Sequence, residues 1–372
     1  MLRELKREIV KVIYSYYKKD LARTSVRLIF DKKCTKQKEI INRVEFFFEK
    51  YNIKYKISYN PLVFPLFRRN IKLFAGFSKP KRYAKQTFLS FNVDPLTNPQ
   101  DGWEYHKVLS LLVPFDEVDE SKNKLAVALN NCKNHKLDKV YLFGTGSSLA
   151  SALNHDCSDG YKIVCNTIVK DSELWRHINP DFIVAADAIY HFGDNLFAKA
   201  FCNDLEKRLS ETLHTSFVYP SFFHPFVKKR FAKFEERLIP IPLGTHKDIC
   251  NNLLERFELP ALGNVLNNML LPLGINLSKN ICLWGFNGRA PDDKDFWKNS
   301  DKHFYNELVD DIKKSHPNFY EYYIPKGNEE KYVKKYHGDE LEQSLEAAES
   351  KGWQFTMLHA SYTPALAKRF KA

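Results

Sequence analysis

Short apolar segments alternate with segments of helical periodicity from residue 139 onward, and this alternation constrains the fold more than any other feature of the sequence. The predicted strands are residues 139–143 (KVYLF), 161–165 (YKIVC), 182–186 (FIVAA), 215–219, 238–242 and 281–284 (ICLW). Before the last of them, Gly263–Gly274 keeps a helical period despite Pro272. Strands that alternate with helices predict an α/β fold with a mostly parallel, Rossmann-like sheet that helices cover on both faces.

Composition narrows the class of protein. The chain has 372 residues, of which 44% are hydrophobic and 27% are charged, and this excludes a disordered or fibrous protein. No apolar run approaches the roughly 20 residues that a membrane span needs, and residues 1–19 are too charged for a secretory signal. Seven cysteines without a CxxC pair indicate reduced thiols rather than disulfides or zinc ligands. We therefore expect a cytoplasmic protein.

Charge is distributed unevenly along the chain. The net charge is +12, yet residues 1–100 contain 23 Lys and Arg against 8 Asp and Glu, so the basic excess lies entirely in this part. The asymmetry predicts a basic amino-terminal module over residues 1–135 and a nearly neutral domain over residues 136–372. The acidic and polar segment Asp116–Lys124 is expected to connect them.

Two basic segments stand out in the amino-terminal module. Residues 2–17 repeat apolar side chains at helical spacing among lysines and arginines, which predicts a basic amphipathic helix, and residues 61–85 interleave Phe with Arg and Lys. Either segment could lie on an anionic lipid surface or hold an acidic partner, or it could be the solvated side of an ordinary core element. The sequence contains no zinc-finger spacing and no RNA-binding aromatic motif, so nucleic acid is not an expected partner.

A glycine turn follows the strand at 139–143 and precedes a predicted helix from Leu149. It consists of Gly144, Thr145, Gly146, Ser147 and Ser148. Backbone N–H groups at a helix start, with two hydroxyls as additional donors, are typical of a phosphate site. The third glycine of a dinucleotide fingerprint is missing, and no GKS or GKT follows as in a nucleoside-triphosphate loop. The alternative is a purely structural turn.

Polar residues end three other predicted strands. Asn166 and Asp187 follow the strands at 161–165 and 182–186, and Gly285-Phe286-Asn287 follows the strand at 281–284. Because the carboxyl ends of parallel strands meet at one edge of a sheet, we expect these residues to lie beside the glycine turn. An Asn amide could bind a base or ribose, and Asp187 a ribose hydroxyl. The alternative is that they only initiate turns.

His337 is the candidate catalytic histidine. It lies just before Asp339, which is expected to cap a helix, and a histidine ahead of a helix start is held neutral by the helix dipole. His224 and His316 precede prolines and are expected in turns, whereas His359 is expected to pack at a strand end.

A DxD sequence, Asp293-Lys294-Asp295, offers two interpretations. Such a pair could hold a divalent ion against a nucleotide diphosphate. Acidic residues after Pro291 equally fit the first turn of a helix.

The order of these motifs, from residue 139 to the carboxyl end, resembles the bacterial sialyltransferases that use CMP-activated sugars, the glycosyltransferase family forty-two type. Those proteins share a glycine turn after the first strand, a strand ending in Cys-Asn, a glycine-led helix closing in Leu-Gly, and a strand followed by Gly-x-Asp. The matching positions are Gly144–Leu149, Cys165-Asn166, Gly263–Gly274 and Gly285–Asn287. A His, a helix, a short strand and a Ser-led helix complete the order at His337, 340–349, 354–358 and Ser361–Arg369. Thr145, Ser147 and Asn287 replace the family's Asn, Pro and Asp.

The resemblance implies a role for each matched residue. Asn166 would contact the nucleotide, Asp187 the ribose, and His337 would be the general base. Arg289 would neutralise the leaving phosphate in place of the family's tyrosines. The other implied substrate-binding residues are Gly144, Thr145, Gly146, Ser147, Ser148, Gly263, Gly285, Phe286, Asn287 and Ser361.

The implied activity is that of an inverting glycosyltransferase. It would move an acidic sugar, sialic acid or keto-deoxyoctulosonate, from a CMP-activated donor to a surface glycan without a metal or other cofactor, and the basic module would face the inner membrane surface or an anionic glycan. Two alternatives stay open. One is an enzyme similar to archaeal-type hydroxymethylpterin diphosphokinases, which share a glycine-x-glycine-x-Ser-Leu turn and use a nucleoside triphosphate with magnesium. The other is a non-catalytic glycan-binding or membrane-binding protein.

Overall fold

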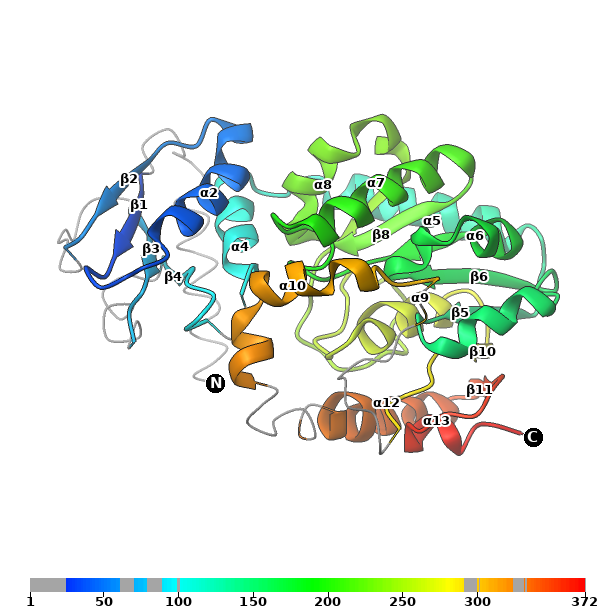
Figure 1. Ribbon diagram of the computed structural model, residues 1–372. Helices are drawn as coiled ribbons and strands as arrows, with labels where there is room; N and C mark the ends of the chain where they lie inside the picture. Colours follow the sequence, from blue (N-terminus) through cyan, green and yellow to red (C-terminus); the bar gives the residue numbers. More distant parts are fainter. Residues whose placement is uncertain are drawn as a thin grey trace. The chain divides into compact units, whose positions relative to one another are not determined.

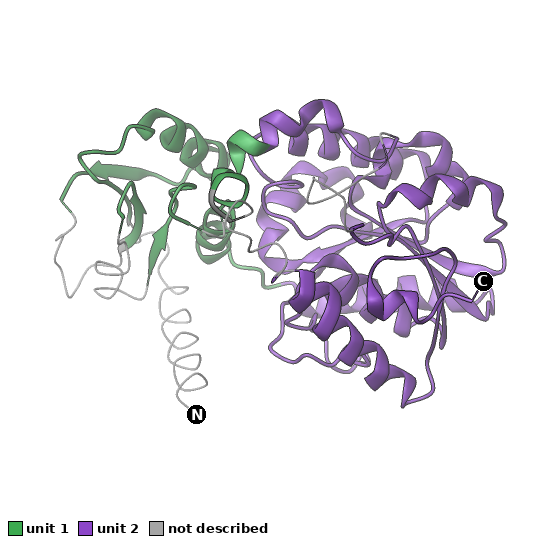
Figure 2. Ribbon diagram, turned by 60° about the horizontal axis from the view of Figure 1, so that its bottom comes forward, with its two compact units in different colours: residues 1–116, 313–322 green, residues 117–312, 323–372 purple. Residues whose placement is uncertain are grey.

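The computed structural model describes residues 25–60, 70–78, 89–98, 101–290, 300, 302–323, 331 and 333–371. The chain divides into two compact units, each with its own all-parallel sheet flanked by helices (Figure 2). Unit 1 comprises Met1–Asp116 and Lys313–Tyr322, and unit 2 comprises Glu117–Ile312 and Tyr323–Ala372. The predicted α/β, Rossmann-like class is therefore confirmed, and it extends to the amino-terminal part.

Unit 2 is built on a seven-stranded sheet in the order β11-β10-β5-β6-β7-β8-β9 (Figure 1). Its strands are β5 (Lys139–Phe143), β6 (Gly160–Cys165), β7 (Phe182–Val184), β8 (Ser216–Pro220), β9 (Leu238–Ile241), β10 (Asn280–Trp284) and β11 (Gln354–Met357). All six strands predicted from apolar runs are confirmed to within a few residues. The strand order reverses at β5, because β6 to β9 follow on one side of it and β10 and β11 are added on the other.

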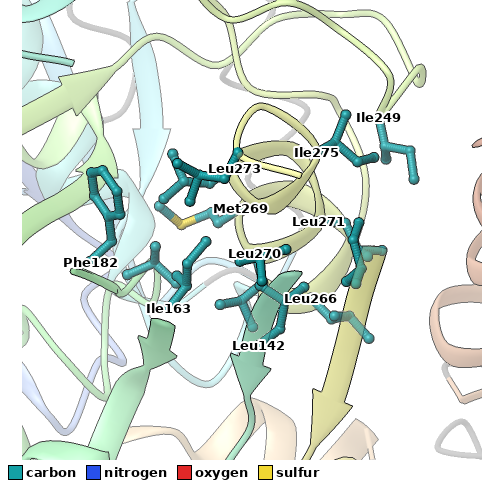
Figure 3. Packing of buried hydrophobic residues seen from close by; sticks show 14 of the residues in the cluster. Leu142, Ile163, Phe182, Ile249, Leu266, Met269, Leu270, Leu271, Leu273 and Ile275 are labelled. Carbon is teal, nitrogen blue, oxygen red and sulfur yellow. The ribbon is translucent and has the colours of Figure 1, made fainter. Parts of the chain in front are cut away.

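One face of this sheet packs against an apolar helical segment. A π-helical stretch, η7 (Leu266–Leu270), continues into α9 (Leu271–Ile275), as the helical period over Gly263–Gly274 predicts. Its side chains lie against Leu142, Ile163 and Phe182 of three neighbouring strands (Figure 3). Helices α5 (Val118–Lys133) and α12 (Glu340–Glu349) add buried side chains to the same cluster.

Aromatic packing covers the opposite face. Phe217 of β8 lies 6.4 Å from Phe192 and 6.1 Å from Phe231, between ring centroids. Phe192 in turn lies 6.4 Å from Phe201 of α7 (Leu196–Glu211). The other helices of this unit are η3 (Ser147–Asn154), η4 (Asn166–Lys170), α6 (Ser172–Ile178), η5 (Ser221–Phe223), α8 (His224–Arg230), η6 (Ala232–Arg237), η8 (Asn306–Leu308), η11 (Lys334–Asp339) and α13 (Pro364–Ala367). Helices on both faces are thus confirmed.

The division between the units differs from the predicted boundary at residue 135. Residues 118–133 form helix α5, which packs on β9: the Ser121 hydroxyl donates to the Pro240 carbonyl over 2.7 Å, and Leu125 and Leu129 are fully buried in the core of unit 2. The expected connector Asp116–Lys124 is mostly the first half of this helix. The helix is polar on one side and has an apolar stripe at i, i+4 spacing on the other. The stripe packs in the core of unit 2, so the helix belongs to that unit.

Unit 1 contains a four-stranded sheet in the order β2-β1-β3-β4. The strands are β1 (Ser25–Phe30), β2 (Tyr55–Ser58), β3 (Asn70–Ala75) and β4 (Ser90–Asn92), with helices α2 (Gln37–Phe48), η2 (Glu49–Tyr51), α4 (Trp103–Leu112) and η9 (Asn318–Tyr323). Helix α10 (Val309–Ser315) spans the point where the chain enters this unit again. The predicted helix at 2–17 lies outside the described residues. Of the basic segment 61–85, only 70–78 is described, and most of that part is strand β3.

Two further expectations can be compared with the structure. All seven cysteines are free thiols, as their spacing indicates. Throughout the described parts of the chain, each helix is too short or too polar to cross a bilayer.

Candidate functional site

Four turns follow four neighbouring strands of unit 2 at the carboxyl edge of the sheet. The strands are β10, β5, β6 and β7, and the turns contain Gly285–Asn287, Gly144–Ser148, Asn166 and Asp187 respectively. Since all strands are parallel, these turns lie on one edge, as predicted. The edge includes the point between β5 and β10 where the strand order reverses, which is where ligands bind in open α/β sheets.

The turns after β5 and β10 are packed backbone against backbone. The Gly144 N–H donates to the Trp284 carbonyl over 2.7 Å, and the Gly146 N–H donates to the Gly285 carbonyl over 2.8 Å. Gly285 has φ +78°, and a Cβ there would overlap the Gly144 carbonyl oxygen. A side chain at Gly144 would overlap the ring of Phe286. These glycines therefore allow the two turns to approach each other.

The side chain of Asn287 connects the turn after β10 to the turn after β5 through hydrogen bonds. Its Oδ1 accepts hydrogen bonds from the Ser148 N–H over 3.0 Å and the Ser148 hydroxyl over 2.8 Å, while the Trp284 indole N–H donates to the Ser148 carbonyl over 2.9 Å. The N–H groups of Gly144, Gly146 and Ser148 thus bond within the protein. This corrects the expectation that they point at a phosphate. Ser147, by contrast, is exposed.

The predicted helix after this turn is present as a 3₁₀-helix. This helix, η3, begins at Ser147, two residues before the predicted start at Leu149. The Leu149 N–H donates to the Gly146 carbonyl over 3.0 Å, which closes the tighter turn.

His359 and Ser361 support the Gly285 turn from the end of β11. The Nε2 of His359 accepts from the N–H groups of Gly285 and Phe286 over 2.9 and 3.3 Å, and its Nδ1 lies 2.7 Å from the Ala360 carbonyl. This pattern requires a neutral imidazole with the proton on Nδ1, and burial lowers the pKa of His359. The interpretation of His359 as a packed strand-end residue is confirmed. The Ser361 hydroxyl donates to the Phe286 carbonyl over 2.7 Å, so it too holds the turn.

Asn166 and Asp187 follow β6 and β7 in different ways. Asn166 has φ +52°, and its Oδ1 is buried but accepts no hydrogen bond within the described part of the chain. Asp187 Oδ1 accepts from the N–H groups of Ile189 and Tyr190, both over 2.7 Å, so its carboxylate forms the turn that the alternative interpretation describes. Burial raises the pKa of Asp187, although these two N–H bonds lower it in part. The Asp187 N–H donates to Nδ1 of buried His191 over 3.1 Å.

Gly263 is a close-packing residue for the segment that carries His337. A Cβ at Gly263 would overlap the ring of Tyr336. The side-chain amides of Asn264 and Asn267 both donate to the Tyr336 carbonyl, each over 2.8 Å. Two π-helical stretches, η7 and η11, therefore meet next to His337, and π-helical turns are frequent at functional sites.

His337 lies inside a helix rather than ahead of one. The π-helix η11 continues directly into α12, and Asp339 has helical φ and ψ and makes no capping hydrogen bond. The expectation that a helix start keeps His337 neutral is therefore wrong. Burial instead lowers its pKa to about 4, so the imidazole is still neutral at pH 7.

The structure thus brings most of the candidate residues together in two groups. The turns after β5 and β10 bring together Gly144, Thr145, Gly146, Ser147, Ser148, Gly285, Phe286, Asn287 and Ser361. Gly263 and His337 form the second group, joined through Tyr336. Arg289 follows Asn287 in the same loop. Asp293 and Asp295 lie outside the described residues, and the described residues contain no cluster of three metal-ligating side chains.

Trp284, Asn264 and Asn267 also support the site, although no motif in the sequence had marked them as candidates. Two asparagines at i, i+3 spacing within the apolar segment GNVLNNMLLPLG were the available signal, because a buried amide needs a polar partner. No protein-family model matches this chain, and no curated protein matches it either.

Proposed function

We propose that unit 2 is an inverting glycosyltransferase that binds a CMP-activated acidic sugar at the carboxyl edge of its seven-stranded sheet and transfers the sugar to a glycan hydroxyl. The observation that carries this proposal is the convergence of four turns from adjacent parallel strands at the reversal of strand order. The order of motifs that resembles the CMP-sugar-dependent sialyltransferases supports the choice of nucleotide.

The cytidine would be recognised through Asn166. Its buried Oδ1 has no partner among the described residues, and a cytosine amino group supplies the donor that this oxygen lacks. The exposed Ser147 and the side chain of Arg289 would meet the phosphate. Asp187 would influence the ribose through the turn that it forms, since its Oδ1 already accepts two backbone N–H groups.

The reaction needs a base and a stabilised leaving group. The acceptor oxygen would form a bond to the anomeric carbon while the bond from that carbon to the phosphate oxygen breaks, with its electron pair leaving on CMP. The acceptor proton would pass to the neutral imidazole of His337. With a pKa near 4, this imidazole is available as a neutral base at pH 7, although it holds a proton weakly. One guanidinium and hydroxyl donors can meet the monophosphate charge, so the scheme requires no metal.

Nucleotide binding is tested first. In a thermal-shift screen of CMP, CDP, UDP and ATP with magnesium, CMP at 100 times its Kd should stabilise the protein by about 2.7 kcal/mol. The variant Asn166→Gly should abolish the thermal shift with CMP, and its backbone should be unstrained because glycine readily adopts positive φ. Asn179→Gly is the matched control, because Asn179 has φ +50° and ends helix α6.

Catalysis is tested separately. His337→Gln should keep the CMP shift and lose transfer by at least about 100-fold, whereas His135→Gln, at an exposed loop position, should leave both unchanged. Stabilisation by ATP with magnesium but not by CMP would favour the diphosphokinase alternative, and no shift with any nucleotide would favour a binding protein. Full transfer by His337→Gln would remove this residue from the mechanism.

A further inference from the structure

Three cationic residues lie side by side across the sheet of unit 1. Arg27 of β1 pairs in register with Lys56 of β2 on one side and with Lys72 of β3 on the other. Partners in a parallel ladder share a face, and neighbouring strands are about 4.8 Å apart. Lys56, Arg27 and Lys72 therefore form one row, called here the cation row, with Ser90 of β4 next in register.

The cation row lies on the sheet face opposite a set of buried apolar residues of β1. Val26, Leu28 and Phe30 alternate with Arg27 along β1 and are buried. On the same face as the cation row, the next row toward the carboxyl ends contains Ile29 and Phe74, which pack with Phe77 as a separate apolar cluster. The charged groups thus adjoin a buried apolar cluster, and water screens charges less there than at an open surface.

Burial increases along the cation row from one edge of the sheet. Lys56 on the edge strand β2 is exposed, Arg27 is half-buried, and Lys72 is 1% exposed. The Nε of Arg27 is buried and has no hydrogen-bond partner among the residues that the structure describes. Burial, and secondarily the charge of Arg27, lowers the pKa of Lys72.

Like charges directly opposite each other on neighbouring strands destabilise a sheet. No carboxylate in the described part of the chain forms an ion pair with Arg27 or Lys56. A bound anion would remove this repulsion and satisfy the guanidinium.

We propose that the cation row is a binding site for a phosphate group, held between Arg27 and Lys56 at the β2 edge of the sheet. A guanidinium binds two phosphate oxygens at once, and an ammonium adds a point charge from the neighbouring strand. Both a free polyphosphate and a phospholipid headgroup carry this chemistry. The site lies in unit 1 and does not depend on the glycosyltransferase proposal.

The test uses the full-length chain and two probes. Inorganic pyrophosphate is titrated by calorimetry, and cosedimentation is measured with phosphatidylcholine vesicles that contain or lack phosphatidylglycerol. The double variant Arg27→Gln/Lys56→Gln should weaken whichever probe binds by at least tenfold. The control Lys38→Gln/Lys133→Gln removes the same charge from exposed positions on α2 and α5 and should change binding less than twofold. Binding of pyrophosphate identifies a soluble phosphate ligand, and binding only to anionic vesicles identifies a headgroup.

Folding of the variant is part of the prediction. Because the substitutions remove repulsion, the double variant should melt no lower than wild type in phosphate-free buffer; if it does melt lower, the exposed single variant Lys56→Gln replaces it in the titrations. The proposal is overturned if neither probe binds wild type, or if the control double variant loses as much affinity as the Arg27/Lys56 variant.

Discussion

At the scale of single residues, Gly285 should be harder to replace than Gly352, although both have positive φ. It combines φ +78° with contact against the Gly144 carbonyl, whereas Gly352 has φ +92° but only the flexible end of Lys279 nearby, 3.7 Å from where the Cβ of an alanine would lie. Gly352→Ala should lower the free energy of unfolding by about 1 kcal/mol, from backbone strain alone. Gly285→Ala should lower it by about 3 kcal/mol, because overlap adds to strain. Denaturant titration of both variants measures the difference, and equal losses would contradict the packing described for the two turns.

Buried His191 should make the free energy of unfolding decrease as the pH falls. Burial lowers its pKa to about 3, while the unfolded state keeps a value near 6.5. As the pH falls through 6.5 the unfolded chain binds the proton and the folded chain does not, so stability decreases. Between pH 7 and pH 5 this group should remove about 2 kcal/mol.

The variant His191→Asn tests that sign. Its side-chain oxygen can still accept the Asp187 N–H, and it does not titrate. The loss of unfolding free energy between pH 7 and pH 5 should therefore be about 2 kcal/mol smaller than in wild type, since the other histidines contribute equally to both proteins. An identical loss in the two proteins would show that the pKa of His191 is the same in the folded and unfolded states.

At the scale of elements, the meeting of η7 and η11 should determine where His337 lies. Asn267→Leu removes one of the two amide donors to the Tyr336 carbonyl while keeping the number and branching of side-chain heavy atoms, and should lower the free energy of unfolding by about 1 kcal/mol. If His337 is the base, this variant should also lose about tenfold in kcat with an unchanged CMP shift. Asn268→Leu, one position along the same helix, is the control. A fall in both kcat and the CMP shift would indicate general damage to unit 2 instead.

The sequence predicts the elements of unit 2 better than their connections. Buried parallel strands such as β5 and β6 are continuous apolar runs, so their signal is local. The unit to which α5 belongs depends on whether its apolar stripe contacts β9. This is a tertiary contact, since Ser121 and Pro240, which form a hydrogen bond, are 119 residues apart in sequence. Likewise, Gly338 and Asp339 have the composition of a helix start, but packing of η11 against Gly263 keeps the backbone helical through both.

The same limit applies to the site. Strand ends predict which residues reach the carboxyl edge, because parallel strands share a direction. They do not predict which N–H groups are already bonded, since the Ser148 N–H pairs with Asn287 from a turn 139 residues away in sequence. In unit 1, Arg27 and Lys72 alternate with apolar residues at a period of two, yet no strand was predicted anywhere in residues 1–135.

At the scale of the whole molecule, the chain contains two separate α/β cores with different charge. Unit 2 contains the candidate nucleotide edge, and unit 1 contains the cation row. Domains with their own cores are expected to unfold and bind ligand as separate units unless a large apolar interface couples them. The two proposals therefore make opposite predictions about which unit each ligand stabilises.

Core variants assign the transitions to units. Leu28 of β1 and Leu142 of β5 are both fully buried, and truncation of either to Ala should cost about 2 to 5 kcal/mol. Leu28→Ala should lower only the melting transition of unit 1, and Leu142→Ala only that of unit 2. CMP should then raise the melting temperature of unit 2, which is the transition that Leu142→Ala lowers. Pyrophosphate should raise the melting temperature of unit 1, which is the transition that Leu28→Ala lowers. Each shift should grow with the logarithm of the ligand concentration. Differential scanning calorimetry with each variant and each ligand measures all four effects. A single transition that both variants and both ligands shift would show that the two cores unfold as one cooperative unit.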